Sequence, residues 1–377
     1  MNYCEKIRYN IFSTELSDFA SMADALLKQL PAGEELLRLV FFDVPPNNEV
    51  YVECFSLLKS KVKAFFGDRE PVLTYVSQPS LDSGLVLEVH SYIKEESDLL
   101  EYKEMDSYPY VVLQNESGRF LFAGGFQSDV LNKSIWQQSV DTFESILKLL
   151  QLENFPINSI VRQWNYIEQI TAFQGTYQNY QAFNDARGDF YVRTTWNNGY
   201  PAATGIGVSH GGILIDLDAV VFTSGSDFAT PLDNKLQVAA HAYSDHVLIS
   251  EQKKKVTPKF ERAKSMTFGN EGVVYISGTA AIRGEESLHD AGLVKQLHIT
   301  MENIDYLVSK ENLVASGVPA KRSSELSMLR VYLKEKSFVD EAKKLIEGYK
   351  LSIPVSFLWA DVCRDELLIE IEGIAMY

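Results

Sequence analysis

The stretch Val273-Val274-Tyr275-Ile276-Ser277-Gly278-Thr279-Ala280 joins an apolar run to a run of small residues. The apolar run predicts a strand, and Ser277–Thr279 predicts a turn after it. Ala281–Ser287 then adds one arginine and two adjacent glutamates, and a helix is expected next, with apolar residues at Leu293, Leu297, Met301, Ile304 and Leu307. Small residues let a ligand approach the backbone, but a solvated glycine turn would show the same pattern. The stretch alone leaves both interpretations open.

The same order of elements occurs earlier in the chain. Arg119–Ala123 is a strand pattern, Gly124–Phe126 takes the place of the small-residue turn, and a helix pattern follows. Each copy continues with an apolar strand, a helix and a final strand in which apolar and acidic residues alternate. These final strands are Leu214–Asp218 and Leu368–Glu372. Alternation of this kind predicts one buried face and acidic side chains that face solvent.

An internal repeat of this length predicts the domain organisation. Residues 1–105 resemble a degenerate copy, residues 106–250 form a second unit, and residues 251–377 form a third. Mixed β-sheets with helices packed on one face make an α+β fold. Three such units in one chain predict a covalent version of a trimer, with sites at the seams between units and a monomer in solution.

Composition limits the possible partners. The chain has 377 residues and a formal net charge of −16, which argues against nucleic acids and anionic membranes because both need a basic face. No apolar run reaches membrane-spanning length, and the start of the chain lacks the apolar core of a signal peptide. Three widely separated cysteines favour a reducing cytoplasm. No histidine has a companion at metal-ligand spacing, so no metal site is predicted.

Two segments could bind an anionic small molecule. Tyr180, Asn184 and Arg187 share one face of an expected helix, and a guanidinium with a phenol is a natural carboxylate clamp. An arginine that crosses a helix beside a core tyrosine is the alternative. Basic residues also gather between Lys253 and Lys264, where most are expected on the surface. Arg262 differs because it leads into the strand before the opening stretch. The sequence shows no phosphate loop, dinucleotide fingerprint or serine-nucleophile elbow.

Several motifs, taken as a set, resemble the chorismatases, the chorismate-hydrolysing branch of the Rid (YjgF-like, chorismate mutase-like) fold. Some members of this branch are described as pteridine-dependent dioxygenase-like proteins. The resemblance covers nearly the whole chain and is weakest before residue 70. The motifs are Ser277–Ala280, Gly284–Ser287, Ala360–Arg364 with Glu370–Gly373, Trp164–Tyr166, the helix from Tyr180 to Arg187, Pro201–Gly207, Gln237 and Phe260–Ala263.

The resemblance implies cleavage of the enol ether of chorismate to pyruvate and a ring product, without metal or organic cofactor. The ring product would be a dihydroxycyclohexadiene carboxylate or a hydroxybenzoate. Protonating the terminal carbon of an enol ether needs a carboxylic acid that a poorly solvated site keeps neutral. By its place in the motif, Glu286 is the expected general acid, with Glu285 beside it in a supporting or solvent-facing position.

The resemblance also suggests residues that bind the dianionic substrate. Arg187 and Arg262 would supply cations, Tyr180 and Tyr243 would donate hydroxyl groups, and Gln237 would hold the ring hydroxyl. Thr279 and Gly205 would shape the pocket beside the ring. Where relatives usually carry an aromatic residue, Arg and Tyr-Pro, this chain has residues 241–244 as His-Ala-Tyr-Ser. A cation is therefore missing unless a lysine from 253–259 replaces it.

Two other functions fit the sequence less well. A Rid-type imine or enamine deaminase would need an arginine just before the final strand pair, and this arginine has no counterpart around Val355–Phe357. A non-catalytic module that binds an aromatic carboxylate is kept open by the altered His241–Ala242 segment.

Overall fold

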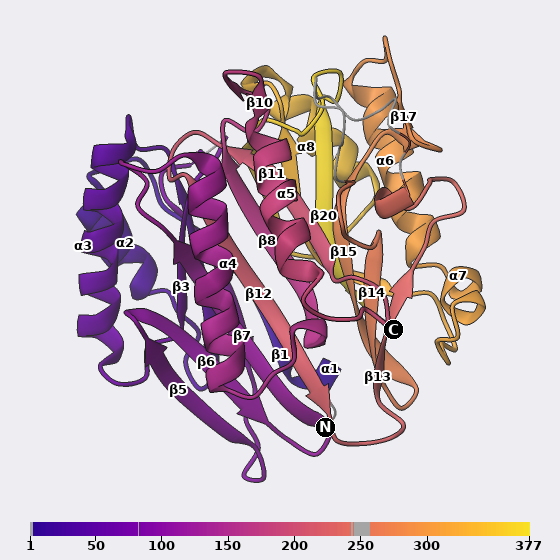
Figure 1. The fold of residues 1–377 in the computed structure, drawn as a ribbon, viewed down its shortest axis with the longest axis horizontal. Coiled ribbons are helices and arrows are strands. Elements are labelled where there is room, and N and C mark those ends of the chain that lie inside the picture. The colour runs from indigo at the N-terminus through magenta and orange to yellow at the C-terminus, as the bar shows by residue number, and fades with distance from the viewer. Residues whose placement is uncertain (1–2, 82, 243, 245–256) are drawn as a thin grey trace.

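A computed structural model of the chain describes residues 3–81, 83–242, 244 and 257–377. In these residues, three larger mixed sheets follow one another along the sequence (Figure 1). The first sheet has the order β1-β4-β2-β3. Its strands are β1 (Ile7–Ser13), β2 (Glu35–Asp43), β3 (Val72–Ser77) and β4 (Val86–Tyr92), and it is accompanied by α1 (Tyr3–Lys6), α2 (Phe19–Leu27) and α3 (Asn48–Phe66).

The second and third sheets share one strand order. The second runs β11-β8-β12-β7-β6-β5, and the third runs β19-β18-β20-β15-β14-β13 when read from its parallel edge. The first sheet, read as β3-β2-β4-β1, matches the first four strands of both orders, counted from the parallel edge. The α+β fold with a repeated unit is therefore confirmed.

The second sheet consists of β5 (Leu99–Met105), β6 (Tyr108–Gln114), β7 (Gly118–Gln127), β8 (Ile160–Glu168), β11 (Ala202–Val208) and β12 (Ile213–Phe222), with the helices α4 (Ile135–Leu152) and α5 (Asn179–Tyr191). The third consists of β13 (Phe228–Leu232), β14 (Ala263–Phe268), β15 (Glu271–Ala280), β18 (Glu325–Leu333), β19 (Val355–Trp359) and β20 (Ile369–Met376), with α6 (Leu293–Leu307), α7 (Lys310–Ala315) and α8 (Val339–Gly348). Two short hairpins form separate two-stranded sheets. One pairs β9 (Phe173–Gln174) with β10 (Tyr177–Gln178), and the other pairs β16 (Ile282–Arg283) with β17 (Glu286–Ser287).

The sheets change over at positions that differ from the predicted unit boundaries. β5 begins at Leu99 and already belongs to the second sheet, and β13 begins at Phe228 and already belongs to the third. The predicted boundaries are at 105/106 and 250/251. A sheet boundary is not a test of a folding unit, so the domain assignment stays a prediction, as does the monomeric state. Among the described residues, no helix is long and apolar enough to cross a membrane.

Each sheet buries one face under its own helices and the other against its neighbours. The outer clusters pair α2 and α3 with the first sheet, α4 and α5 with the second, and α6 and α8 with the third (Figure 1). The amphipathic α4 shows how the sequence sets this up, since Ser134 and Gln137 form a capping box at its start and Phe143 and Ile146 face the core. Two central clusters combine side chains from all three sheets. Each aliphatic side chain buried there contributes about 1.5–3 kcal/mol.

The predicted turn at Ser277–Thr279 is wrong, because β15 continues through it to Ala280. Its pairing with β20 shifts register between Ile276 and Thr279, which makes Ser277–Gly278 a bulge opposite Glu372. Gly124–Gly125 form the same irregularity within β7, opposite Asp216. A bulge inserts a residue without ending the strand, so a strand interrupted by small residues resembles a turn in the sequence.

The bulges also correct the alignment of the repeat. Glu372 corresponds to Asp216, and Glu370 therefore corresponds to Leu214, rather than to Asp216 as the acidic alternation suggests. A second bulge in each central strand, just before Arg38 in β2 and just before Arg162 in β8, gives the same register and places Glu88 with Asp216.

The acidic residues of the final strands do not face solvent. Asp216, Asp218, Glu370 and Glu372 are all buried near the centre of the molecule. Three arginines, Arg38, Arg162 and Arg330, lie there with their guanidinium carbons 5.0, 4.6 and 5.7 Å from the ring of Trp164. At each seam one of these arginines pairs with a carboxylate of the neighbouring sheet: Arg38 with Asp216, Arg162 with Glu372, and Arg330 with Glu88. We call these three buried pairs the ion-pair hub. The alternating acidic pattern therefore marks buried ion pairs and not a solvent-exposed face of the sheet.

Candidate active site

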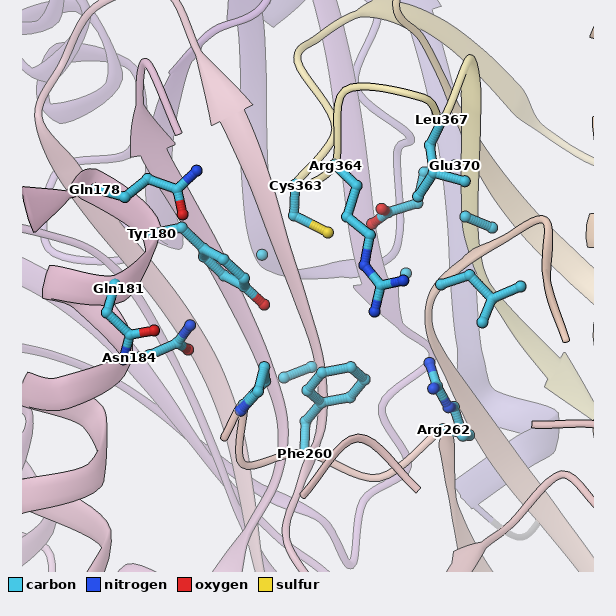
Figure 2. A pocket seen from close by; sticks show the side chains of 16 residues that line it. Gln178, Tyr180, Gln181, Asn184, Phe260, Arg262, Cys363, Arg364, Leu367 and Glu370 are labelled. Atoms are coloured by element: carbon cyan, nitrogen blue, oxygen red, sulfur yellow. The ribbon is translucent and has the colours of Figure 1, made fainter. Parts of the chain in front are cut away.

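A pocket opens at the seam between the second and third sheets (Figure 2). Its walls come from α5 and the residue before it, from β11, from the segment that leads into β14, from β15 and β16, and from β20 and the loop before it. The lining residues are Gln178, Tyr180, Gln181, Asn184, Ala203, Gly205, Pro258, Phe260, Arg262, Gly278, Ala280, Ile282, Cys363, Arg364, Leu367 and Glu370. Polar and cationic groups therefore converge from segments up to 190 residues apart, which is typical of a ligand site.

Glu370 on β20 is the one carboxylic acid among these lining residues. Its side chain is 5% exposed, and no described residue donates a hydrogen bond to it. A Cβ atom at residue 278 would lie 2.0 Å from Glu370 Oε1, so the carboxyl group rests against the backbone of Gly278. Burial, followed by the negative charge of Glu372, raises the pKa of Glu370 to about 8, although Arg262 and Arg162 act in the opposite direction. Glu370 is therefore a neutral acid at pH 7.

Two arginines, Arg262 and Arg364, place positive charge in the same pocket. Arg262 donates from Nη2 to the Val238 carbonyl oxygen at 2.8 Å. Arg364 donates from Nη1 to the Glu285 carbonyl oxygen at 2.9 Å and to Ser287 Oγ at 3.0 Å. Figure 2 shows both guanidinium groups directed into the pocket near Phe260. Such a pair can bind the carboxylates of a dianion.

Neutral donors complete the wall. The phenol of Tyr180 and the thiol of Cys363 point toward the same space as Arg364 (Figure 2). Burial raises the pKa of the Cys363 thiol to about 12, and burial also raises the pKa of the Tyr180 phenol. Both groups therefore keep their protons at neutral pH and can donate to a bound oxygen atom.

The structure does not fit Glu286 as the general acid. Glu286 is exposed on β17, in the hairpin above the pocket, and it does not line the pocket. Its exposed carboxyl group lacks the poorly solvated surroundings that the role requires. The residues on either side of Glu286 contact the pocket instead, because the Glu285 carbonyl and the Ser287 hydroxyl accept hydrogen bonds from Arg364. The Glu285 carboxylate accepts from Ser244 N at 2.8 Å and Ser244 Oγ at 2.6 Å.

The other predicted residues divide into two groups. Arg262, Tyr180 and Gly205 line the pocket. Arg187 is buried beside it and donates to Asn184 Oδ1 at 2.6 Å, so it orients a lining amide without reaching the pocket.

Gln237 and Thr279 are buried outside the lining residues. Gln237 donates to the Ile282 carbonyl, and Thr279 donates to the Ser277 carbonyl. Tyr243 and the lysines at 253–255 lie outside the described residues. Arg364, which was not among the predicted residues, is a second arginine in the pocket lining beside Arg262.

Sequence reasoning missed Glu370, Arg364 and Cys363 as site residues. All three belong to a stretch, Ala360–Gly373, whose motifs were recognised but whose side chains were not assigned. The available signal was the acid at position 370 where the second unit has Leu214, but this comparison needs the bulge register. Cys363 carried no signal, because a lone cysteine has no characteristic spacing.

Gly278→Ala tests the close contact between backbone and acid. A methyl group at residue 278 would overlap the Glu370 carboxyl group. The carboxyl group would have to move, because residue 278 belongs to β15, whose backbone is paired with β20. We expect at least a tenfold loss of turnover of the substrate, because misplacing a catalytic group by about 1 Å can cost roughly a hundredfold. The matched control is Gly292→Ala, where a Cβ would meet nothing within 4 Å. Equal activity of the Gly278 variant and the wild type would contradict the contact.

Comparison with known proteins identifies relatives of this chain. A sequence model described as "Chorismatase FkbO/Hyg5-like, N-terminal" matches residues 105–219. A 3-hydroxybenzoate synthase from Streptomyces hygroscopicus is 32% identical over 240 residues, which cover 60% of this chain and 66% of that protein. The chain belongs to the chorismatase family.

Other chorismatases extend the match. One from Streptomyces rapamycinicus is 26% identical over 62% of this chain and 68% of its own length. A solved chorismatase structure covers 98% of this chain and 99% of its own chain, with a TM-score of 0.72 and 19% identity. At that identity the structure shows a shared fold, and it shows it over almost the whole chain.

Proposed function

We propose that this chorismatase-family protein cleaves the enol ether of chorismate and releases pyruvate. The observation that carries the proposal is Glu370, a buried carboxylic acid with a raised pKa that lines one pocket together with two arginines. The reaction needs an acid that is neutral at pH 7 and cations for two carboxylates, and the pocket has both.

In the proposed complex, Arg262 and Arg364 bind the carboxylates of the substrate, and Tyr180 and Cys363 donate to its oxygen atoms. Fixed donors in a buried pocket orient the enolpyruvyl group against Glu370 and require little rearrangement during the reaction. The arginines also favour an anionic substrate in a chain whose net charge is −16.

Glu370 then transfers its proton to the terminal methylene carbon of the enolpyruvyl group. The alkene electron pair forms the new C–H bond, and the adjacent carbon becomes an oxocarbenium ion stabilised by the ether oxygen and the new Glu370 carboxylate. A water molecule adds to this carbon and returns a proton to Glu370. The resulting hemiketal collapses: the bond between its central carbon and the ether oxygen breaks, the hydroxyl proton passes to that oxygen, and pyruvate and the ring alcohol, a dihydroxycyclohexadiene carboxylate, are released. A hydroxybenzoate product requires that one molecule of water is also lost from the ring. Hydrolysis of this kind balances without a redox step.

The ring product of this chain, a dihydroxycyclohexadiene carboxylate or a hydroxybenzoate, is left to the assay. Purified protein is incubated with chorismate, pyruvate is followed with lactate dehydrogenase and NADH, and the ring product is separated by chromatography and identified by mass. We expect stoichiometric pyruvate and ring product. Well-folded protein that releases no pyruvate above the spontaneous rate would overturn the proposal. Ammonia release from an imine substrate, or chorismate binding without turnover, would instead favour the deaminase or the binding module.

A further inference from the structure

Glu372 lies two residues after Glu370 on the same face of β20 and is 1% exposed. One of its oxygens, Oε2, accepts from Arg162 Nη2 and from the Thr204 hydroxyl. The other, Oε1, accepts from Arg330 Nη1 at 2.9 Å and from the Tyr332 hydroxyl at 2.7 Å. Four donors therefore fix the position of this carboxylate beside Glu370.

Arg162 is held on Glu372 by one corner of its guanidinium group. Its Nη2 is shared between Glu372 and Thr204 Oγ1, the latter at 2.9 Å. Its Nε and Nη1 are buried and have no hydrogen-bond partner in the described part of the chain. Thr204 Oγ1 also accepts from Gly278 N at 3.0 Å, which ties this corner to the bulge beneath Glu370. Arg162 thus retains unused donors in a buried place where its charge already acts on Glu370.

The other seams show what an arginine does to a carboxylate here. Asp216, the counterpart of Glu372 in the second unit, is bound by Arg38 Nη1 at 2.7 Å. Glu88 in the first unit is bound by Arg330 through two hydrogen bonds of 2.6 and 2.7 Å. Glu370 is an additional carboxyl group, at a position that Leu214 and Val86 fill with buried apolar side chains. An arginine that bound Glu370 in the same way would keep it ionised and unable to donate a proton.

We propose that Glu372 is a positioning residue that retains Arg162 on itself and on Thr204, and so keeps Glu370 free of a cationic hydrogen-bond partner and protonated. The inference rests on the proposed role of Glu370 as the acid. In this arrangement Arg162 binds one of two neighbouring carboxyl groups, that of Glu372, and the other, that of Glu370, carries the proton.

Other charged or titratable groups also face Glu370. Arg262 approaches from the segment before β14, Arg364 and Cys363 from the loop before β20, Tyr180 from α5, and Tyr332 lies opposite on β18. None of them changes in the variants proposed below. A change in the pH at which Glu370 loses its proton can therefore be attributed to the change at Glu372 or Arg162.

The test is Glu372→Gln, which keeps the shape of the side chain and removes the anion that holds Arg162. We expect Arg162 to turn to Glu370, turnover at pH 7 to fall at least tenfold, and the high-pH limb of the kcat/KM profile to move down by one pH unit or more. In Arg162→Gln/Glu372→Gln the competing cation is absent as well, so the limb should return toward the wild-type position. A double variant that is no better than Glu372→Gln, or a limb that stays in place, would overturn the proposal.

A second readout does not depend on turnover. Infrared difference spectra between each protein and its own Glu370→Gln derivative isolate the carbonyl stretch of the protonated Glu370 side chain. Its disappearance with rising pH should occur at lower pH in Glu372→Gln than in the wild type. Absence of pyruvate with this shift present would reject the proposed function and keep the positioning role. Pyruvate release without the shift would do the reverse.

The matched control is Asp216→Asn, which removes the corresponding buried carboxylate of the second unit and its bond to Arg38. It should leave the high-pH limb in place, whereas general damage to the hub would move both variants alike. Thr204→Val covers the case in which Glu372→Gln does not fold, since it removes the hydroxyl that helps to hold Arg162. Its limb should move in the same direction by a smaller amount, and an unmoved limb would again count against the proposal.

Discussion

Glu370→Gln is expected to lower kcat for pyruvate release from chorismate by about 10²- to 10⁴-fold, the usual contribution of a general acid, with little change in KM. Glutamine keeps the size of the side chain and its contact with Gly278, but it has no proton acidic enough to protonate carbon. The arginines that bind the substrate are unchanged. The measurement is steady-state pyruvate release, together with binding of chorismate by calorimetry.

The wild-type pH profile should show the same acid. Because the pKa of Glu370 is about 8, kcat/KM should be level on the acid side of that value and fall about tenfold for each pH unit above it. The descending limb assigned to Glu370 should be absent from the residual activity of Glu370→Gln.

Glu286→Gln is the matched control, because it makes the same change to an exposed glutamate in the hairpin above the pocket. We expect turnover within about twofold of the wild type, since a change at an exposed position should leave the pocket undisturbed. Loss of turnover in Glu286→Gln with normal turnover in Glu370→Gln would reverse the assignment.

Stability separates loss of the acid from loss of the fold. The folded-state pKa of Glu370 lies above the unfolded value of about 4.5, so the folded protein binds more protons between these values and loses stability as pH rises through that window. At pH 7 this penalty is roughly 3 kcal/mol. Glu370→Gln does not ionise, and it should therefore unfold at a higher urea concentration than the wild type at pH 7, with a smaller difference at pH 5.

Much of the fold can be predicted from residues that are close in sequence. Val273–Ile276, Leu214–Asp218 and the helix from Leu293 to Leu307 each contain a local pattern, and the order of these patterns reveals the repeat. The bulge at Ser277–Gly278 cannot be predicted in this way. Its small residues resemble a turn, and only the pairing with β20 shows that the strand continues.

The site depends on contacts that local patterns do not encode. Glu370 and Glu372 alternate with apolar residues in the manner of a solvated strand, yet both are buried, and Glu372 is bound by Arg330 and Arg162, which lie 42 and 210 residues away. The resemblance to the chorismatases pointed to Glu286, which is exposed and outside the pocket, whereas Glu370 lines it. Gly278, in the bulge of β15, leaves the space that the Glu370 carboxyl group occupies.

Arg330→Met should cause the largest loss of stability, about 3–5 kcal/mol, because it leaves the buried Glu88 carboxylate without its arginine and removes one of the two arginines that bind Glu372. Arg330 donates to both oxygens of Glu88, to Glu372 Oε1 at 2.9 Å and to the Tyr166 hydroxyl at 2.8 Å. Burial favours the neutral form of Glu88, but the neighbouring Arg330 lowers its pKa below the usual value. Urea unfolding followed by tryptophan fluorescence measures the effect, since Trp164 lies beside the Arg330 guanidinium group.

Two further variants show whether the cost comes from an unpaired buried charge. Arg193→Met breaks the exposed ion pair with Glu144 and should cost at most about 1 kcal/mol. Arg330→Met/Glu88→Gln removes both partners of the seam between the third and first units and should be more stable than Arg330→Met alone, because a neutral amide replaces the uncompensated carboxylate. Equal stability of the single and double variants would mean that Arg330 stabilises the seam by packing on Trp164 and Phe42 instead of by charge. A cost below about 1 kcal/mol for Arg330→Met would mean that the hub does not hold the three units together.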